Sequence, residues 1–239
     1  MILFDGQRPS DSPFVERIWC SHSEGAHPFL SIAVSRLELV VSKLQGKVTL
    51  TVRGPETKVT PIGDCPDGGE WFGILLKPGA FLSHLPVRSL VDDLVNLPAA
   101  SNNTFWLGGS AWQFPNYENA DTFVDRLVRE GLLVRDPIVE AALQGHPTND
   151  LTLRSVQYRF LQSIGITQNA VRQIERARYA TILLQQGVSI PDTVLQAGYY
   201  DQPHLSRSLK HFIGRTPAQL LHHSQPEQLS FLYKTTPFL

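Results

Sequence analysis

The stretch "AGYYDQPHLSRSLKHFIGRTPAQLL", residues 197–221, has the punctuation of short helices separated by tight turns. Asp201 is a good helix N-cap, and Pro203 falls in the first turn, where the missing N–H of proline costs nothing. Apolar residues then recur at the helical period, and Gly214 is suited to end the helix in the left-handed region. We therefore predict a helix over residues 202–213.

Another short helix precedes this one. Ser189 is its expected N-cap, Asp192 completes a weak capping box three residues later, and Gly198 ends the helix. Two short helices joined by a few residues have the layout of a helix-turn-helix unit. A plain three-helix core has the same punctuation, so the layout alone does not establish a function.

The same pattern occurs a second time in the chain. The segment "TLRSVQYRFLQSIGITQ", residues 152–168, aligns with "DQPHLSRSLKHFIGRTP", residues 201–217, after a shift of 49 residues. In both segments an N-cap residue, an apolar stripe and a terminating glycine occupy matching positions. We interpret the segments as two copies of one module, with the first helix over about residues 153–164.

A long helix is predicted between the two copies, over residues 168–186, from the N-cap Thr167 to Gly187. Its roughly 19 residues span about 28 Å. Two recognition helices that read one face of B-DNA lie about 34 Å apart. The spacing therefore favours a double DNA-reading domain, while an ordinary helical domain with a long central helix remains the alternative.

The polar faces of the two repeated helices carry side chains that suit base recognition. Arginine can bond the O6 and N7 atoms of guanine, and glutamine can pair with adenine. The candidates read from the faces are Arg154, Ser155 and Tyr158 in the first helix, and Pro203, His204, Arg207 and Lys210 in the second. Every amphipathic helix has a polar side, so a solvated face is the alternative for each residue taken singly.

The N-terminal half has the pattern of short strands. Runs such as "RLELVVSK", "KVTLTVRG", "WFGILLKPG" and "TFWLGG" are broken by glycine and proline, and Val48, Leu50 and Val52 alternate with polar neighbours. From Asp121 onward the pattern becomes helical. We predict an α+β protein whose β-rich barrel or sandwich precedes an all-α domain. Its expected segments are a β-rich domain (1–118), a helical connector (119–145), a double helix-turn-helix domain (146–225) and a tail (226–239).

The charge is distributed unevenly along the chain. The net charge is −1, but residues 146–239 hold nine Lys and Arg against five Asp and Glu, about +4. A basic C-terminal part favours an anionic partner. The sequence has neither a membrane-length apolar run nor a signal peptide at its start, and Cys20 and Cys65 make no disulfide framework. We therefore expect a cytoplasmic protein that does not enter a membrane.

The second copy resembles the DNA-binding domain of the AraC-type transcription regulators. "GYYDQPHLSRSLKHFIGRTP" meets the family signature "G-[FY]-x-[DS]-[QS]-x-[HF]-[LF]-x-R-x-[FL]-K-x-x-x-G-x-[TS]-P", and the resemblance covers about residues 151–221. One departure concerns the first copy, where "QGHPTNDL" stands in place of a positioning helix that ends in Gly-[FY]. We expect residues 136–143 to serve as a substitute positioning helix. The resemblance places Arg154, Gln157, Tyr158, Gln202, Pro203, His204 and Arg207 at DNA-contact positions.

The resemblance implies a regulator that binds double-stranded DNA as a monomer or homodimer, contacts RNA polymerase, and needs no cofactor. The N-terminal half resembles the sensor or dimerisation half of such regulators, which is often cupin-like, and it implies a small-molecule effector. Aromatic residues of a β domain are more often plain core, but some could line an effector pocket. These candidates are Trp19, Trp71, Phe72 and Trp106.

Two other functional classes remain open. One is a cupin-type enzyme with an accessory helical domain, but the chain has no nucleophile elbow, P-loop or Rossmann glycines, and its His22, His27 and His84 are scattered without a His-x-His pair. We therefore expect no metal site. The other is an interaction adaptor that keeps the helical fold without binding DNA, because a charge of about +4 is small for a DNA-binding domain.

Overall fold

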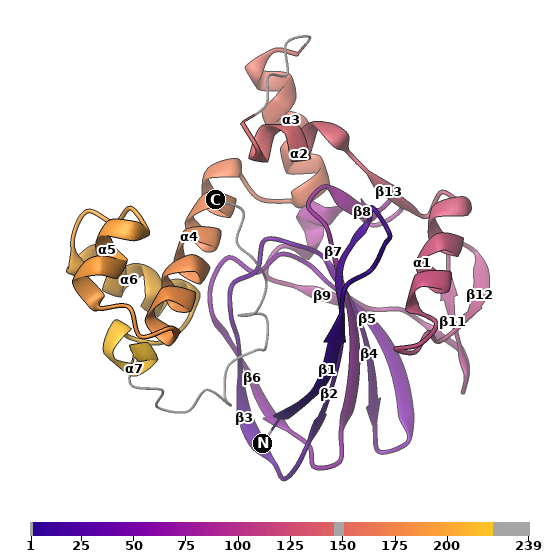
Figure 1. Ribbon diagram of the computed structural model, residues 1–239. Helices are drawn as coiled ribbons and strands as arrows, with labels where there is room; N and C mark the ends of the chain where they lie inside the picture. Colours follow the sequence, from indigo (N-terminus) through magenta and orange to yellow (C-terminus); the bar gives the residue numbers. More distant parts are fainter. Residues whose placement is uncertain (1, 146–150, 222–239) are drawn as a thin grey trace.

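The computed structural model describes residues 2–145 and 151–221, in which a β-rich part precedes a helical part (Figure 1). This order confirms the predicted α+β class. The strands of the β-rich part are β1 (Ile2–Arg8), β2 (Val15–Ser23), β3 (His27–Ser31), β4 (Glu38–Leu44), β5 (Lys47–Arg53), β6 (Thr60–Cys65), β7 (Glu70–Leu76), β8 (Ala80–Leu82), β9 (Leu94–Asn96), β10 (Ala99–Ser101), β11 (Thr104–Leu107) and β12 (Ser110–Gln113). A 3₁₀ turn, η1 (Val87–Leu90), lies between β8 and β9.

The largest sheet is antiparallel and has the strand order β1-β2-β7-β4-β5-β9. The predicted alternation of β5 is seen in its pairing with β4, where Leu50 lies opposite Val41 and Val52 lies opposite Leu39. Leu50 and Val52 are buried and Val48 is partly buried. Alternate residues of a strand point to opposite faces, so this alternation places one face of β5 in the core.

The remaining strands form three smaller sheets. These are β10-β11-β12, β3-β6, and β8 paired with β13 (Leu133–Arg135). Within the described residues the strands divide among four sheets, so the cupin-like barrel stays a prediction. The predicted tail, residues 226–239, lies outside the described residues.

The helical part follows the predicted order of short and long helices. Its helices are α1 (Ala120–Arg129), α2 (Pro137–Leu143), α3 (Leu153–Ile164), α4 (Gln168–Gln185), α5 (Ile190–Gln196), α6 (Gln202–Phe212) and α7 (Pro217–Leu221). The connector was predicted to be helical, but it also contains β13 between α1 and α2. The reason is tertiary: Leu133 is buried in the core, and β13 pairs with β8, which lies about 50 residues earlier in the chain.

The predicted N-caps account for where the helices of the repeated modules begin. In each case the capping side chain accepts a hydrogen bond from the backbone N–H three residues later. The pairs are Thr152 with Ser155, Thr167 with Ala170, Ser189 with Asp192, and Asp201 with His204. A cap of this kind contributes about 1 kcal/mol to stability.

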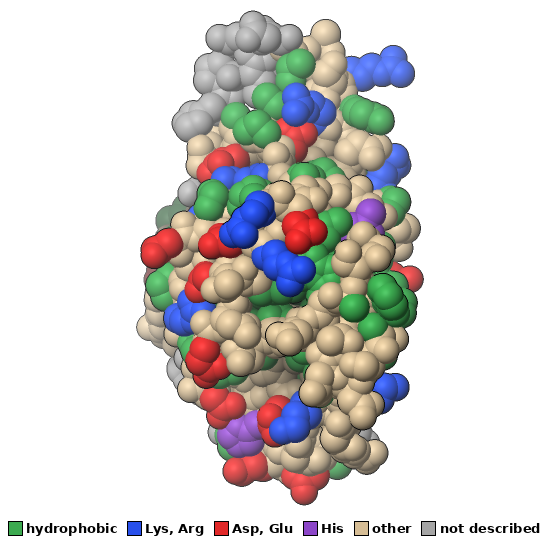
Figure 2. Space-filling model, turned by 90° about the vertical axis from the view of Figure 1, so that its right-hand side faces the viewer, with side chains coloured by type: hydrophobic (Ala, Val, Ile, Leu, Met, Phe, Trp, Pro, Cys, Tyr) green, Lys and Arg blue, Asp and Glu red, His purple; other side chains and the backbone are tan. Residues whose placement is uncertain are grey.

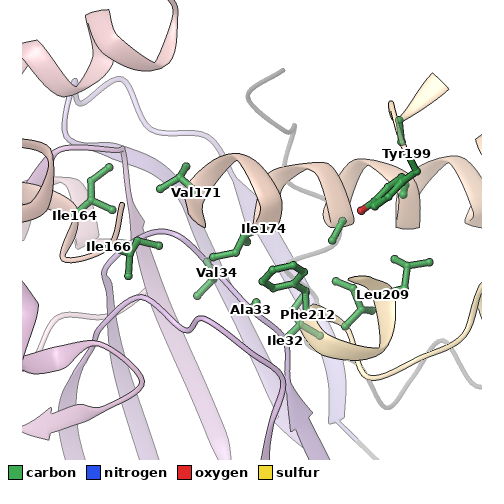
Figure 3. Close-up of a cluster of buried hydrophobic side chains, with 14 of the residues drawn as sticks. Ile32, Ala33, Val34, Ile164, Ile166, Val171, Ile174, Tyr199, Leu209 and Phe212 are labelled. Carbon is green, nitrogen blue, oxygen red and sulfur yellow. The ribbon is translucent and has the colours of Figure 1, made fainter. Parts of the chain in front are cut away.

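The two parts share a hydrophobic core. Residues Ile32, Ala33 and Val34, which follow β3, pack against α4 and α6 in one buried cluster (Figure 3). The side chains labelled from the helical part are Ile164, Ile166, Val171, Ile174, Tyr199, Leu209 and Phe212. The helical part is therefore docked on the β-rich part and does not form a separate body.

A pair of glycines offers a test of this docking. Gly165 and Gly187 have the same φ of 84° and end α3 and α4. A Cβ on Gly165 would lie 3.0 Å from Val91 Cγ2 and 3.1 Å from the Val87 carbonyl oxygen, whereas no described atom lies within 4 Å of a Cβ on Gly187. Only the first position is therefore confined by the β-rich part.

We expect Gly187→Ala to destabilise the protein by roughly 1–2 kcal/mol, the cost of a left-handed alanine. Gly165→Ala is expected to cost about 1–3 kcal/mol more, because its methyl group overpacks the contact with η1. Urea denaturation of both variants checks this difference. Equal losses of stability would show that α3 does not press against η1 in solution.

Candidate nucleic-acid interface

The second repeated helix, α6, presents a polar face opposite its buried face. Leu205 and Leu209 are fully buried, while Arg207 and Lys210 are exposed on the other side of the helix. The exposed end of α6 also carries two further candidates, Gln202 and Pro203. The helix begins where the Asp201 carboxylate accepts a hydrogen bond from the His204 N–H at 2.7 Å.

The Gly-Tyr pair before α6 shapes and anchors the turn. Gly198 has a φ of 67°, which few other residues tolerate, and it lets the chain leave α5. Tyr199 is buried, its hydroxyl lies 2.8 Å from Ser208 Oγ on α6, and the Arg176 guanidinium of α4 lies 4.6 Å from its ring centroid. Burial raises the pKa of Tyr199, which keeps the hydroxyl neutral as a hydrogen-bonding group.

His204 lies at the flank of the α6 polar face. Its ring is partly buried and meets the ring of Tyr199 edge to face, with centroids 5.1 Å apart. Its Nδ1 is 3.5 Å from the backbone nitrogen of Tyr200. The turn therefore constrains this side chain more than it constrains Arg207.

The first repeated helix, α3, has the same arrangement. Val156 and Phe160 are buried, and Arg154, Gln157 and Tyr158 are exposed, Tyr158 with 62% of its surface accessible. Ser155 differs from the other candidates because it belongs to the cap: its Oγ lies 2.9 Å from Thr152 Oγ1. Both polar faces therefore point away from the cores that hold the helices.

The predicted substitute for a positioning helix is present as α2, which packs against α3. The Asp136 carboxylate caps α2 by accepting from the Ile138 N–H at 3.0 Å. The same carboxylate accepts from Arg159 Nε of α3 at 2.8 Å. One side chain thus begins α2 and connects it to α3, although a positioning role on DNA stays a prediction.

Both repeated helices are held at their C-terminal ends by the β-rich part. The Ala33 N–H donates to the Phe212 carbonyl at 2.8 Å, and the Val59 N–H donates to the His211 carbonyl at 2.9 Å. At the end of α3, Gly165 lies against η1. No described part of the chain covers the exposed side chains in the N-terminal turns and polar faces of α3 and α6.

The exposed cations on these faces are available for a ligand. Among the described residues, Arg154, Arg207 and Lys210 take part in neither an ion pair nor a side-chain hydrogen bond. The face of the molecule on the side of α1 is different, because Lys and Arg side chains are interspersed there with Asp and Glu (Figure 2). A face with such mixed charge does not favour the binding of an anionic polymer.

Two polar residues of α4 that received no role from sequence reasoning lie next to the α3 face. Asn169 and Arg172 are exposed, and together with Gln157 they line a hollow of about 390 Å³ between α3 and α4. The signal in the sequence is their i, i+3 spacing in the first turns of a helix that directly follows the first repeated helix.

The four aromatic candidates for an effector pocket are not brought together. Trp19 lies opposite Gly73, which is two residues from Trp71 in β7, so Trp19 and Trp71 are on the same face of the large sheet. Phe72, between Trp71 and Gly73, is on the opposite face. Trp106 belongs to another sheet and is 48% exposed. Trp19 is a buried side chain whose Nε1 donates to Glu38 Oε1 at 2.6 Å.

Other kinds of site are not seen in the parts of the chain that the structure describes. Residues 2–145 and 151–221 contain no group of three or more His, Cys, Asp or Glu side chains placed to hold a metal ion. No helix in these ranges is long and apolar enough to cross a membrane. Burial raises the pKa of the Cys20 thiol, as do the carboxylates of Asp5 and Glu118, so the reactive thiolate is disfavoured.

Comparison with known proteins bears on the helical part. Residues 149–223 match the model of a family described as a helix-turn-helix domain. No curated protein matches the chain. Among solved structures, the chain is similar to a crystal structure of an apo ToxT variant from Vibrio cholerae, with 10% sequence identity over 90% of this chain and 99% of that chain, and a TM-score of 0.43.

Proposed function

We propose that the helical part of this chain, which is an AraC-type helix-turn-helix domain, makes the protein a sequence-specific transcription regulator that reads DNA with two helices. The observation that carries the proposal is the repeated polar face. Arg154, Gln157 and Tyr158 on α3, and Gln202 and Arg207 on α6, are exposed on helices that the protein holds from the other side. Such side chains reach base edges in the major groove.

The long helix α4 sets the distance between the two readers. It has 18 residues and spans about 27 Å. The α5–α7 unit lies at one end of α4 and α3 lies at the other (Figure 1). A rigid helix of this length suits two recognition helices in successive major-groove segments, about 34 Å apart along one face of B-DNA.

The candidate residues divide by chemistry. The arginines Arg154 and Arg207 suit guanine, and the glutamines Gln157 and Gln202 suit adenine. Lys210 and Arg172 suit the phosphate backbone, where a point charge or a guanidinium fixes the position of a protein on the duplex. The β-rich part, residues 1–118, would then serve as the sensor or dimerisation domain.

Selection of bound fragments from sheared genomic DNA tests the proposal. At near-physiological salt, we expect the wild-type protein to enrich a sequence with two blocks about one helical turn apart. Retention of no fragment, both alone and with metabolite extract added, would support the interaction adaptor. Equal retention of all fragments under both conditions would contradict sequence-specific reading. The extract is needed because an effector could be required for binding.

The spacing between the two blocks gives a sharper prediction. Inserting five base pairs between them rotates one block to the opposite face of the duplex, so we expect roughly a 100-fold loss of affinity, as several base contacts worth about 1–3 kcal/mol each are lost. Because α4 is a continuous helix of fixed length, an insertion of ten base pairs is expected to weaken binding as well. Recovery at ten base pairs in an electrophoretic mobility assay would contradict the rigid connection.

A further inference from the structure

The N-terminal half of α3 exposes two large apolar side chains. The large hydrophobic residues that are exposed in the described parts of the chain are Leu94, Trp106, Leu153, Tyr158, Leu195 and Tyr200. Two of them, Leu153 and Tyr158, belong to the 12-residue helix α3, where they stand on either side of Arg154 in the chain. Single apolar residues scattered over a surface are ordinary. Two of them in the first turns of one proposed reading helix indicate a contact.

The stability of the fold does not account for Leu153. It is the first residue of α3, and 74% of its surface is accessible. The helix is capped by Thr152, whose hydroxyl oxygen accepts from the Ser155 N–H at 3.2 Å, and it is packed through the buried Val156 and Phe160. An apolar side chain gains free energy only where it leaves water, so Leu153 contributes little to folding.

The second module differs at the matching positions. With the shift of 49 residues, Leu153 aligns with Gln202 and Tyr158 aligns with Arg207. Both residues of α6 are exposed and polar, and no residue of α6 is among the exposed large hydrophobic residues of the described chain. The two helices therefore present different chemistry from equivalent places, apolar on α3 and hydrogen-bonding on α6.

The major groove of DNA offers a partner for an apolar side chain. The N-terminal residues of a helix that enters this groove contact the edges of the bases. Each base pair displays its own pattern there, and thymine displays a C5-methyl group, which apolar side chains contact. Leu153 stands at the N-terminal end of α3, and the Tyr158 ring follows little more than one helical turn later.

We propose that α3 recognises thymine through its C5-methyl group, with Leu153 as the specificity-determining residue and the Tyr158 ring extending the apolar surface. Contact with the methyl group removes the exposed Leu153 side chain from water. This inference rests on the proposed DNA-reading function, and it names a base that neither Arg154 nor Gln157 selects.

Replacing thymine with uracil in the DNA tests the contact. The block read by α3 is the one at which Arg154→Ala relaxes specificity in the sequence selected by the wild-type protein. Each thymine of this block is replaced singly by deoxyuridine, which pairs with adenine in the same way but lacks the methyl group. In a fluorescence anisotropy titration we expect at least one replacement to weaken binding about three- to tenfold, the effect of removing one buried methyl group.

Matched variants locate the contact on the protein. Leu153→Ala is expected to bind the thymine and uracil forms of the sensitive position equally, while keeping its fold because the side chain is exposed. Leu195→Ala makes the same change at a leucine of α5 that is 80% exposed, and it is expected to keep the full ratio between the two forms. Tyr158→Phe is expected to keep the ratio as well, because the ring remains.

The outcomes separate this inference from the function on which it rests. Sequence-selective binding that is insensitive to uracil throughout the α3 block, or a selected α3 block without thymine, would overturn the inference alone. A uracil effect that persists unchanged in Leu153→Ala would also overturn it, because another group would then contact the methyl. Failure to select any DNA sequence would remove the proposed function itself, and this inference with it.

Discussion

Replacing Glu175 with alanine is expected to lower the free energy of unfolding by about 3–5 kcal/mol, because the change removes a buried carboxylate that faces two buried arginines. Glu175 of α4 is fully buried. Its Oε1 accepts from Ser35 Oγ at 2.7 Å and from Arg36 Nη1 at 3.1 Å, and it lies 3.6 Å from Arg178 Nη1. This carboxylate therefore joins the β-rich part to the long helix.

The physical basis is the cost of burying charge. Arg178 is also buried, and this burial lowers the pKa of its guanidinium while the negative charge of Glu175 raises it. Without this carboxylate, Arg178 loses the negative charge 3.6 Å from its guanidinium, and Arg36 loses one of its two carboxylate contacts and keeps the ion pair with Glu16. We expect the interface between the two parts to open before the β-rich core unfolds, since the loss is confined to their contact.

Urea denaturation followed by far-UV circular dichroism, which reports on the helical part as well as the β-rich part, measures this loss. The control is Glu130→Gln, which removes an exposed ion pair: Arg126 Nε lies 3.3 Å from Glu130 Oε1, and the two side chains are 52% and 45% exposed. An exposed i, i+4 pair contributes less than about 1 kcal/mol. If Glu175→Ala destabilised the protein no more than this control, the buried network would not hold the two parts together.

Arg207→Ala is expected to reduce affinity for the selected DNA sequence by about 1–3 kcal/mol, roughly 5- to 150-fold, and to relax specificity at one base pair. Arg207 is exposed on α6 and makes no ion pair or side-chain hydrogen bond among the described residues. Its removal is expected to take away the proposed base contact without exposing the core. The melting temperature should therefore stay within about 1 °C of wild type, because surface changes of this kind alter stability little.

Lys210→Ala is the matched variant for a phosphate contact. Lys210 lies on the same face of α6 as Arg207. We expect its replacement to weaken binding about equally on all sequences and to reduce the salt dependence of the affinity by about one counterion. Competition binding with the selected sequence, with single-base variants of it, and at two salt concentrations separates the two patterns. Uniform weakening by Arg207→Ala would show that this arginine contacts only phosphate.

Arg154→Ala extends the comparison to α3, whose support by α2 departs from the family pattern. Loss of specificity at a second base pair, about one helical turn from the first, would show that both helices read bases. A variant that binds like wild type would confine base reading to α6.

The repeated modules were predictable from the sequence, whereas their attachment to the β-rich part was not. Asp201, the apolar period and Gly214 together determine α6, since capping and helical hydrogen bonds join residues that are three or four positions apart. The same local rules located the strand β5. They could not find β13, because an isolated run of three residues becomes a strand only when it meets β8.

The long-range contacts have no local signature at all. Ser35 and Glu175 are separated by 140 positions in the chain, and nothing in either neighbourhood marks them as partners. Likewise, Trp19 and Phe72 lie on opposite faces of the large sheet because of how β2 and β7 are paired, and this pairing cannot be read from either residue's neighbours. The local identity of each helix thus follows from neighbouring residues, while the shared core and the buried ion network depend on chain packing, which brings together groups that the sequence keeps far apart.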